Sequence, residues 1–258
     1  MNNTGTIAGR KLVQISANSI NNTAGSLSGQ TVALNAVQDI NNIGGVIVAD
    51  TNLLMQAGRD INVASTTQSS AGSNGAYSFS QSGIDRVASV YTRGPGTLVA
   101  SAGNNITLTA AQLSSGGDAQ VLAGNNLTLG TVGTSRSDNL FATNADNHLN
   151  TSSTQQAGTA IKGAGSLKLG AGNDINATAV DVQAGQALRV NAGGSVLIAA
   201  GQNTNNLEEA HKTTCGGFFG GSSVVTRETR NETSAQASTF GGVTNACTRQ
   251  SASPKLFL

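Results

Sequence analysis

Short runs of alternating apolar and polar residues recur along the whole chain. Val13, Ile15 and Ala17 form the first run, with polar residues between them. Side chains two residues apart lie on one face of a β-strand, whereas a helix repeats its apolar positions every three or four residues. The same alternation returns in six later triplets: Val32, Leu34, Ala36; Leu53, Met55, Ala57; Ile106, Leu108, Ala110; Leu167, Leu169, Ala171; Leu188, Val190, Ala192; and Val196, Ile198, Ala200. The pattern predicts short β-strands rather than amphipathic helices.

These strands repeat with a period of twenty to twenty-one residues. Gly5, Gly25 and Gly45 are twenty residues apart, and Gly103 and Gly124 are twenty-one apart. Several triplets are followed by a turn of Ala, Gly and then Asn or Asp, residue types that favour or tolerate positive φ. Fixed periods of this length are typical of solenoids, in which each repeat buries its apolar face by stacking on its neighbours.

A coil of this length with short strands and turns fits a parallel β-helix, in which each coil rises by about 4.8 Å. The leucine-rich repeat needs the pattern L-x-x-L-x-L-x-x-N, which this chain lacks. A β-sandwich with regularly spaced turns remains open at this stage. We therefore predict an all-β parallel β-helix with coils of about 20–21 residues.

Three polar segments interrupt the period, and they define the expected organisation. We expect a β-helical rod over residues 1–202, interrupted by polar excursions at 65–93 and 131–164. Residues 203–241 form the next segment, and its polar excursion covers 203–240. All three are rich in polar residues and poor in apolar triplets. We predict that they leave the rod as loops or as outward-folded pairs of strands.

The two ends of the chain differ from the repeats in different ways. Asn2-Asn3-Thr4-Gly5 is already in phase with residues 21–25, so we expect a piece of a longer array, and the first residues lack the basic and apolar regions of a signal peptide. Residues 242–258 lose the alternation and bring Cys247, Pro254 and Phe257 together. We hypothesise that a frameshift or premature stop produced this tail.

Composition narrows the classes of function. Only 10% of the residues are charged and 3% aromatic, there is no Trp, and the net charge is +1. Without a basic patch the chain is not expected to bind nucleic acid. No stretch of about 18 apolar residues is present to span a membrane as a helix. The two cysteines, Cys215 and Cys247, are too few for a disulfide scaffold.

Few residues suggest chemistry. There are two histidines, His148 and His211. His211 and Cys215 lie four residues apart and could form half of a metal site, but two ligands do not complete a zinc site, and we expect a solvated loop there. The glycine-rich stretches lack the Walker and dinucleotide-binding motifs, so turn glycines explain them better.

Single acidic residues recur at equivalent turns. Asp39, Asp60 and Asp174 each precede Ile-Asn, but a calcium ladder needs denser acids. We expect these residues to cap their own turns. The sequence therefore predicts no catalytic, cofactor-binding or metal-binding residues, and no cofactor.

Four segments resemble the haemagglutinin repeats of filamentous haemagglutinin-like exoproteins, the family that includes the stalks of contact-dependent growth inhibition systems. They are Ala57-Gly58-Arg59-Asp60-Ile61-Asn62 with residues 63–67; Gly83-Ile84-Asp85-Arg86 with residues 87–98; Ala171-Gly172-Asn173-Asp174-Ile175-Asn176 leading to residues 199–203; and Glu208-Glu209-Ala210-His211 through residues 226–240. The resemblance covers about residues 1–241. It implies a right-handed parallel β-helix and offers no catalytic residues to carry over.

The resemblance also implies a context. Such proteins cross the outer membrane of Gram-negative bacteria through a two-partner-secretion transporter and act at the cell surface or outside the cell. They adhere to a receptor on a host or neighbouring cell, or carry a C-terminal toxin to it. We therefore expect a non-enzymatic stalk fragment of an adhesin or toxin-delivery protein.

Two other classes of function stay open. Polysaccharide lyases also use parallel β-helices, but they need acids and bases that converge on adjacent coils, and the acids here are scattered. The excursions could instead form a receptor-binding module, with Tyr77, Tyr91, Phe218 and Phe219 as contact residues.

Overall fold

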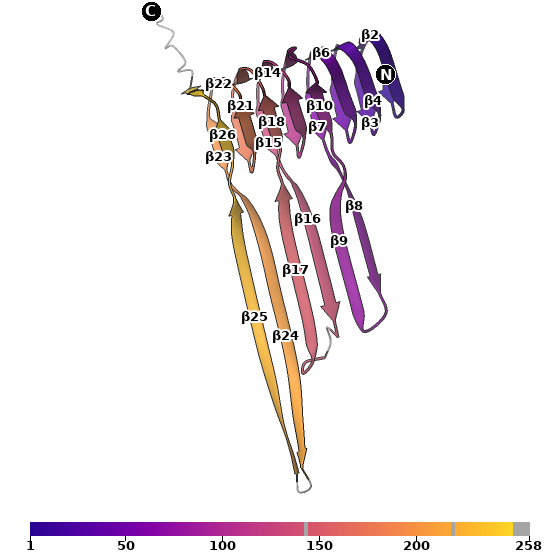
Figure 1. Ribbon diagram of the computed structural model, residues 1–258, viewed down its shortest axis with the longest axis vertical. Helices are drawn as coiled ribbons and strands as arrows, with labels where there is room; N and C mark the ends of the chain where they lie inside the picture. The colour runs from indigo at the N-terminus through magenta and orange to yellow at the C-terminus, as the bar shows by residue number, and fades with distance from the viewer. Residues whose placement is uncertain (142–143, 218–219, 250–258) are drawn as a thin grey trace, which may run out of the picture.

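A computed structural model describes residues 1–141, 144–217 and 220–249. Within these residues the protein has strands and no helix, and the strands form two parallel sheets and one antiparallel sheet. The parallel sheets wind into a rod, and the antiparallel sheet projects from one side of it (Figure 1). This arrangement confirms the prediction of an all-β parallel β-helix.

The first sheet of the rod has one strand from each of eight coils. Every strand pairs in parallel with its equivalent one coil away, as Ile20 to Thr23 do with Ile40 to Ile43. In order, the strands are β1 (Asn2–Asn3), β3 (Ile20–Thr23), β5 (Ile40–Ile43), β7 (Ile61–Ala64), β12 (Ile106–Thr109), β15 (Leu127–Gly130), β20 (Ile175–Thr178) and β23 (Val196–Ala199). Backbone hydrogen bonds thus run the length of the rod.

The second sheet begins with three long strands that bend around a corner and then splits into two rows. A bulge interrupts the pairing between Gly29 and Thr31, where the long strands bend. The long strands are β2 (Thr6–Ala17), β4 (Ser26–Ala36) and β6 (Val46–Ala57). One row continues as β10 (Ser89–Thr92), β13 (Gln112–Ser115), β18 (Ala160–Gly163), β21 (Asp181–Ala184) and β26 (Thr239–Gly241). The other continues as β11 (Leu98–Ala102), β14 (Ala119–Ala123), β19 (Leu167–Ala171), β22 (Ala187–Ala192) and β27 (Thr244–Arg249).

The split has a local cause at residues 94–96. Pro95 has no N–H for a ladder hydrogen bond, and a Cβ on Gly96 would lie 1.9 Å from the carbonyl oxygen of Thr51. Only glycine fits at that distance, and the strand breaks there into β10 and β11. The later coils keep the break, so the rod becomes three-sided.

The interior of the rod consists of aliphatic columns. Equivalent residues of successive coils stack in register and are almost completely buried. One column is Ile20, Ile40, Ile61, Ile106, Leu127 and Ile175, each with 0–1% of its surface exposed. Burial of this apolar surface contributes about 25 cal/mol per Å². The predicted triplets of residues 32–36, 53–57, 167–171 and 188–192 supply further columns. The last predicted triplet is different, because Ile198 and Ala200 are exposed in the final coil.

The three polar segments form β-hairpins that share one sheet, hereafter the hairpin sheet. The hairpins are β8 (Thr66–Ser73) with β9 (Tyr77–Arg86), β16 (Val132–Leu140) with β17 (His148–Ala157), and β24 (Gly201–Gly217) with β25 (Gly220–Gln236). They pair edge to edge in the order β25-β24-β17-β16-β9-β8. Figure 1 shows them side by side below the rod. The alternative of outward-folded strand pairs is thus confirmed over that of loops.

The hairpins leave the rod at the same corner of the fourth, sixth and eighth coils, after β7, β15 and β23. Two coils rise by about 9.6 Å, and one hairpin is two strands wide, also about 9.6 Å. Hairpins on every second coil therefore lie at the spacing that one continuous sheet requires. Hairpins on every coil would collide, and wider spacing would leave gaps.

Four of the five coils without a hairpin close this corner with one residue in the left-handed region. These residues are Ala24 (φ 54°), Gly44 (φ 58°), Ala110 (φ 47°) and Ala179 (φ 49°). Three of the four are alanines, for which this conformation is unfavourable. Stacking between the coils holds the tight corner in place.

Each hairpin ends before the predicted excursion does. The strand that follows the hairpin belongs to the rod: β10 lies within 65–93, β18 within 131–164 and β26 within 203–240. Ala88 and Val90, both fully buried, show the reason, because they face the rod interior. The apolar–polar alternation at these residues is short and lies within a polar segment, so the sequence does not distinguish it as a rod strand.

Backbone pairing continues into the segment in which the alternation stops. Thr244–Arg249 form β27, which pairs with β22 over six residues. Parallel pairing uses only main-chain groups, so it does not need alternating side chains. The other tail residues, 250–258, lie outside the described residues, and the frameshift hypothesis stays a prediction. In the described part of the chain, no helix is long and apolar enough to cross a bilayer.

Candidate interaction surface

The hairpin sheet has two faces, because successive side chains of a strand point to opposite sides. Cross-strand register places uncharged polar residues on one face, hereafter the neutral face. Its three rows are Ser69, Ser82, Ser135, Thr154, Thr204, Thr233; Ala71, Ser80, Ser137, Ser152, Asn206, Asn231; and Ser73, Ser78, Asn139, Asn150, Glu208, Thr229. Glu208 carries the single charge among these positions.

The opposite side, hereafter the charged face, carries ionised and large side chains. Its rows are Ser70, Gln81, Arg136, Ser153, Asn205, Glu232; Gly72, Phe79, Asp138, Thr151, Leu207, Arg230; and Tyr77, Leu140, Leu149, Glu209, Glu228. The two sides of one sheet therefore offer different chemistry.

Side chains of the neutral face hydrogen-bond to one another across strands. The hydroxyls of Ser82 and Ser135 lie 3.0 Å apart, and those of Thr154 and Thr204 lie 2.7 Å apart. The Asn206 amide donates to the Ser152 hydroxyl at 3.2 Å. These pairs link β9 to β16 and β17 to β24, so the neutral face joins different hairpins.

A polar groove of about 690 Å³ lies on the neutral face. Its lining side chains from that face are Ser137, Asn139, Asn150, Ser152, Asn206, Glu208, Thr229 and Asn231. The Oδ1 atom of Asn150 is buried and has no hydrogen-bond partner. Buried polar atoms are normally satisfied, so an orphaned acceptor here needs an explanation.

The charged face is organised around Asp138. Tyr77 donates its hydroxyl hydrogen to the Asp138 carboxylate at 2.6 Å, and the Arg136 guanidinium contacts the other carboxylate oxygen at 2.6 Å. Both hydrogen bonds, that from Arg136 first, lower the pKa of Asp138, and the bond to Asp138 raises the pKa of Tyr77. Phe79 stacks with Tyr77 at a centroid distance of 6.1 Å and covers Gly72 of the edge strand.

A second groove, of about 740 Å³, lies on the charged face closer to the rod. Three glutamines line it, Gln68, Gln81 and Gln155, and the Gln81 amide donates to the Ser70 hydroxyl at 3.1 Å. The polar atoms of this groove include the paired Arg136.

The longest hairpin holds the tip of its neighbour. Lys212 of β24 contacts the Asp146 carboxylate at 2.7 Å, and Arg227 of β25 lies 3.9 Å from it. The hydrogen bond from Lys212 is the main cause of the lowered pKa of Asp146. His148 donates its Nδ1–H to the Asn144 carbonyl oxygen, 2.7 Å away.

A hydroxyl closes the base of each hairpin; those of Ser65 and Thr159 are buried and that of Ser238 is half-buried. Thr159 donates to the Gly130 carbonyl at 2.8 Å, and Ser238 donates to the Ala199 carbonyl at 2.6 Å. Each of these two hydroxyls also accepts a backbone N–H from a neighbouring coil. Ser65 has the corresponding role in the first hairpin and donates to a corner carbonyl at 2.6 Å. At the base of each hairpin, the hydroxyl thus provides hydrogen-bond partners for a carbonyl oxygen and an N–H group of the main chain.

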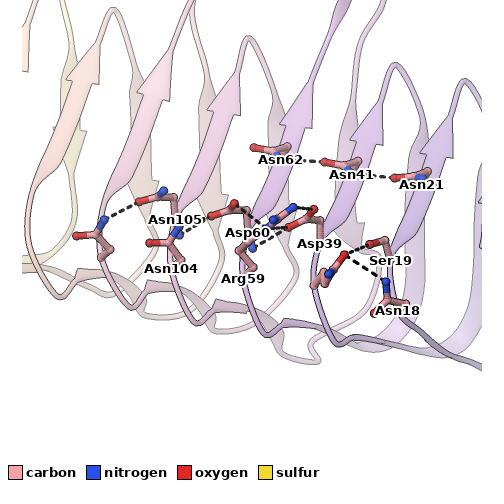
Figure 2. A network of polar contacts seen from close by, with 12 residues as sticks. Asn18, Ser19, Asn21, Asp39, Asn41, Arg59, Asp60, Asn62, Asn104 and Asn105 are labelled. Carbon is pink, nitrogen blue, oxygen red and sulfur yellow. Dashed lines mark hydrogen bonds and ion pairs between the residues drawn. The ribbon is translucent and has the colours of Figure 1, made fainter.

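The recurring turn acids bind the next coil, which corrects the expectation that they cap their own turns. Asp39 accepts the N–H of Asp60 at 3.3 Å, and Asp60 accepts that of Asn105 at 2.9 Å (Figure 2). The series continues through Asn126 and Asp174. Each position needs only a side-chain oxygen that accepts a hydrogen bond, which explains why both Asn and Asp occur in the series. The twenty-one-residue spacing was the signal for it.

The candidate metal half-site does not assemble. His211 and Cys215 lie four residues apart on strand β24, a separation of about 13 Å along an extended chain. His211 is exposed and lies 3.7 Å from Glu209, and Cys215 is exposed. Among the described residues, no three His, Cys, Asp or Glu side chains converge.

The four aromatic residues proposed as contacts have different places. Tyr77 lies on the hairpin sheet, half-buried. Tyr91 lies on rod strand β10, with the Arg93 guanidinium 5.9 Å from its ring centroid, so it is not part of an excursion. Phe218 and Phe219 lie outside the described residues. Sequence reasoning missed the neutral groove, because its lining residues come from two hairpins that are far apart in the chain.

Comparison with known families gives one result. The model of the family described as "Hemagglutinin repeat" matches residues 13–84 and 84–215, most of the chain. No curated protein and no solved structure matches the sequence.

Proposed function

Because this chain belongs to the hemagglutinin-repeat family, we propose that it is a stalk segment of a secreted bacterial adhesin. The repeat is a structural, adhesin-type unit found in secreted and cell-surface proteins. The stacked aliphatic columns are the observation that carries the proposal, since they make a rod of eight coils, about 38 Å long. Such a rod can display other parts of a protein at a distance from the cell.

The finer proposal concerns secretion and cargo. A two-partner-secretion transporter in the outer membrane of a Gram-negative bacterium exports the parent protein, and the rod carries an adhesive tip or a C-terminal toxin of the contact-dependent inhibition type. Support comes from the family and from stacked coils that are joined by backbone hydrogen bonds and buried aliphatic columns. The scattered acidic side chains of the rod favour a non-enzymatic role.

An export experiment tests the stalk function. The chain is fused behind a family secretion domain and expressed with its transporter, and protease accessibility at the surface of intact cells is measured. We expect surface exposure that depends on the transporter. Retention of the fusion in the periplasm, with the secretion domain alone still exported, contradicts the proposal.

A second candidate function is receptor binding by the hairpin sheet. The sheet extends away from the rod (Figure 1). Both of its faces carry grooves. A sheet normally buries one face, so two uncovered faces favour a surface used for contact. Beads coated with the purified chain should adhere to epithelial or bacterial cells more than albumin-coated beads do. Equal adhesion contradicts this candidate.

A further inference from the structure

The groove on the neutral face has a lining that selects by chemistry. Seven of its eight neutral-face side chains are hydroxyls or amides, and Glu208 is the eighth. The Glu208 side chain is 62% exposed and lies 3.8 Å from His148. The groove can therefore donate and accept many hydrogen bonds but holds only one carboxylate.

Cationic groups near the groove are already engaged. Arg227 and Lys212 lie on the same side of the sheet as the groove, one and two rows nearer the hairpin tips, and both contact Asp146. Arg136 and Arg230 belong to the charged face, where they pair with Asp138 and Glu232 respectively. A sulfated, phosphorylated or carboxylated ligand would meet Glu208 and no cation among the lining residues.

Apolar anchors are also missing from the lining. Leu207 contributes to the groove, but its row in the register belongs to the charged face, as does that of Thr151. Peptide ligands draw most of their binding energy from buried apolar or aromatic anchors. The lining thus does not favour a peptide.

The orphaned Asn150 acceptor lies among the lining residues of the groove. An amide turned by rotation about its last side-chain bond could present either its oxygen or its NH₂ group to a ligand hydroxyl. A polyhydroxyl ligand supplies both donors and acceptors, so it can satisfy whichever group the amide presents.

From these observations we propose that the groove on the neutral face binds an uncharged glycan. The site consists of Asn139, Asn150, Asn206 and Asn231 as amide partners, with Ser137 and Ser152 between them. The proposal rests on the second candidate function and names the chemistry of the receptor. The hydroxyl pairs within the rows fix the directions of neighbouring side chains, which reduces the entropy lost on binding.

Affinity electrophoresis of the full chain tests this site. The gels contain dextran, mannan or galactan as uncharged probes, and heparin or alginate as anionic probes. We expect at least one uncharged polysaccharide to retard the chain and neither anionic probe to do so. The site is overturned if no uncharged polysaccharide retards it, or if an anionic probe retards it equally.

Two variants locate the site. Asn150→Ala combined with Asn231→Ala should weaken binding about tenfold or more, because each lost hydrogen bond costs about 1 kcal/mol. Asn205→Ala, on the charged face of the adjacent strand, is the matched control and should bind normally. If the double variant fails to fold by circular dichroism, Ser137→Arg replaces it and should block the groove sterically. Equal binding by the folded groove variant and the control overturns the assignment.

Failure of this inference is distinguishable from failure of receptor binding. In one outcome, coated beads adhere to cells and no added uncharged polysaccharide reduces that adhesion. This outcome would leave the receptor function intact and would overturn the glycan site. Adhesion abolished by protease treatment of the cells, with no retardation in the gels, would show a protein receptor instead.

Discussion

Asn22 donates its side-chain amide to Oδ1 of Asn42, 2.7 Å away, inside the rod. Both side chains are completely buried, and Asn3 extends the ladder by one coil. The Asn22 amide also donates to the Gly25 carbonyl at 3.1 Å. Asparagine thus satisfies a corner carbonyl where an aliphatic residue could not.

Replacement of Asn22 tests this internal ladder. Asn22→Ala leaves the buried Asn42 oxygen without its donor and removes one of the two donors to the Gly25 carbonyl, which also accepts the N–H of Val46. We therefore expect the free energy of unfolding to fall by about 1–3 kcal/mol. Urea unfolding followed by circular dichroism measures it. Asn21→Ala, which removes a link of the outer ladder, is the control and should cost less than about 1 kcal/mol. Similar losses for the two variants would contradict the role of the buried ladder.

The hydroxyl at the base of the second hairpin is a second test. Thr159→Val keeps the shape of the side chain but removes the donor to Gly130 and the acceptor for Ala111. We expect a loss of about 1–3 kcal/mol and faster hydrogen exchange in β16 and β17. Thr134→Val removes a half-buried hydroxyl of the same hairpin, one that donates only a 3.3 Å hydrogen bond to the Gln155 carbonyl, and it should change both quantities less. Unchanged exchange in Thr159→Val would show that the base hydroxyl does not hold the hairpin.

The turn ladder predicts which substitutions its acceptor positions tolerate. Asn126→Asp keeps the oxygen that accepts the N–H of Asp174 and should change stability little. Asn126→Ala removes that acceptor and should cost about 1 kcal/mol. Thermal unfolding of the two variants compares them directly. Equal stability of the Ala and Asp variants would mean that the acceptor is not needed.

Four carboxylates make stability depend on pH. The hydrogen bond from Arg59 lowers the pKa of Asp39, and those from Arg136, Lys212 and Thr239 lower the pKa values of Asp138, Asp146 and Asp181. A lowered folded-state pKa gives stability that is present above the unfolded pKa, about 3.9, and is lost as the pH falls through the folded value. We expect the urea midpoint to be constant near neutral pH and to drop below about pH 4.

The variant Asp39→Asn identifies one source of that acid sensitivity. It should lower the midpoint at neutral pH and reduce the drop between neutral and acidic pH, because the titrating partner of Arg59 is gone. Identical pH profiles for this variant and the native chain would exclude a contribution from the Asp39–Arg59 pair.

The rod could be predicted from the sequence and the hairpin sheet only in part. Alternation at Val32 and Leu34, repeated after about twenty residues, specifies inward side chains and stacking. The hairpins carry Ser and Thr on the neutral face and polar residues on much of the charged face. Without an apolar–polar contrast their strands cannot be told from loops. Their union into one sheet depends on the match between coil rise and strand spacing, which no single segment encodes.

The candidate groove could not be predicted for a related reason. Asn139 and Asn231 are far apart in the chain and line the same groove only after the second and third hairpins have paired. Asparagines in polar segments are also common turn residues, so their presence carries no signal by itself. By contrast, His211 and Cys215 are close in sequence but do not converge, because both lie on the extended strand β24.

Disulfide trapping across two hairpins tests the central claim most directly. In a chain with Cys215 and Cys247 replaced by Ser, the variants Ser82→Cys and Ser135→Cys place two thiols where hydroxyls now lie 3.0 Å apart. Ser82→Cys with Thr154→Cys is the control, since that pair is two strands, about 9.6 Å, apart and too distant to bridge. We predict rapid oxidation to a disulfide within one chain for the first pair and none for the control. A first pair that stays reduced, or that oxidises no faster than the control, would contradict a single sheet built by hairpins on alternate coils.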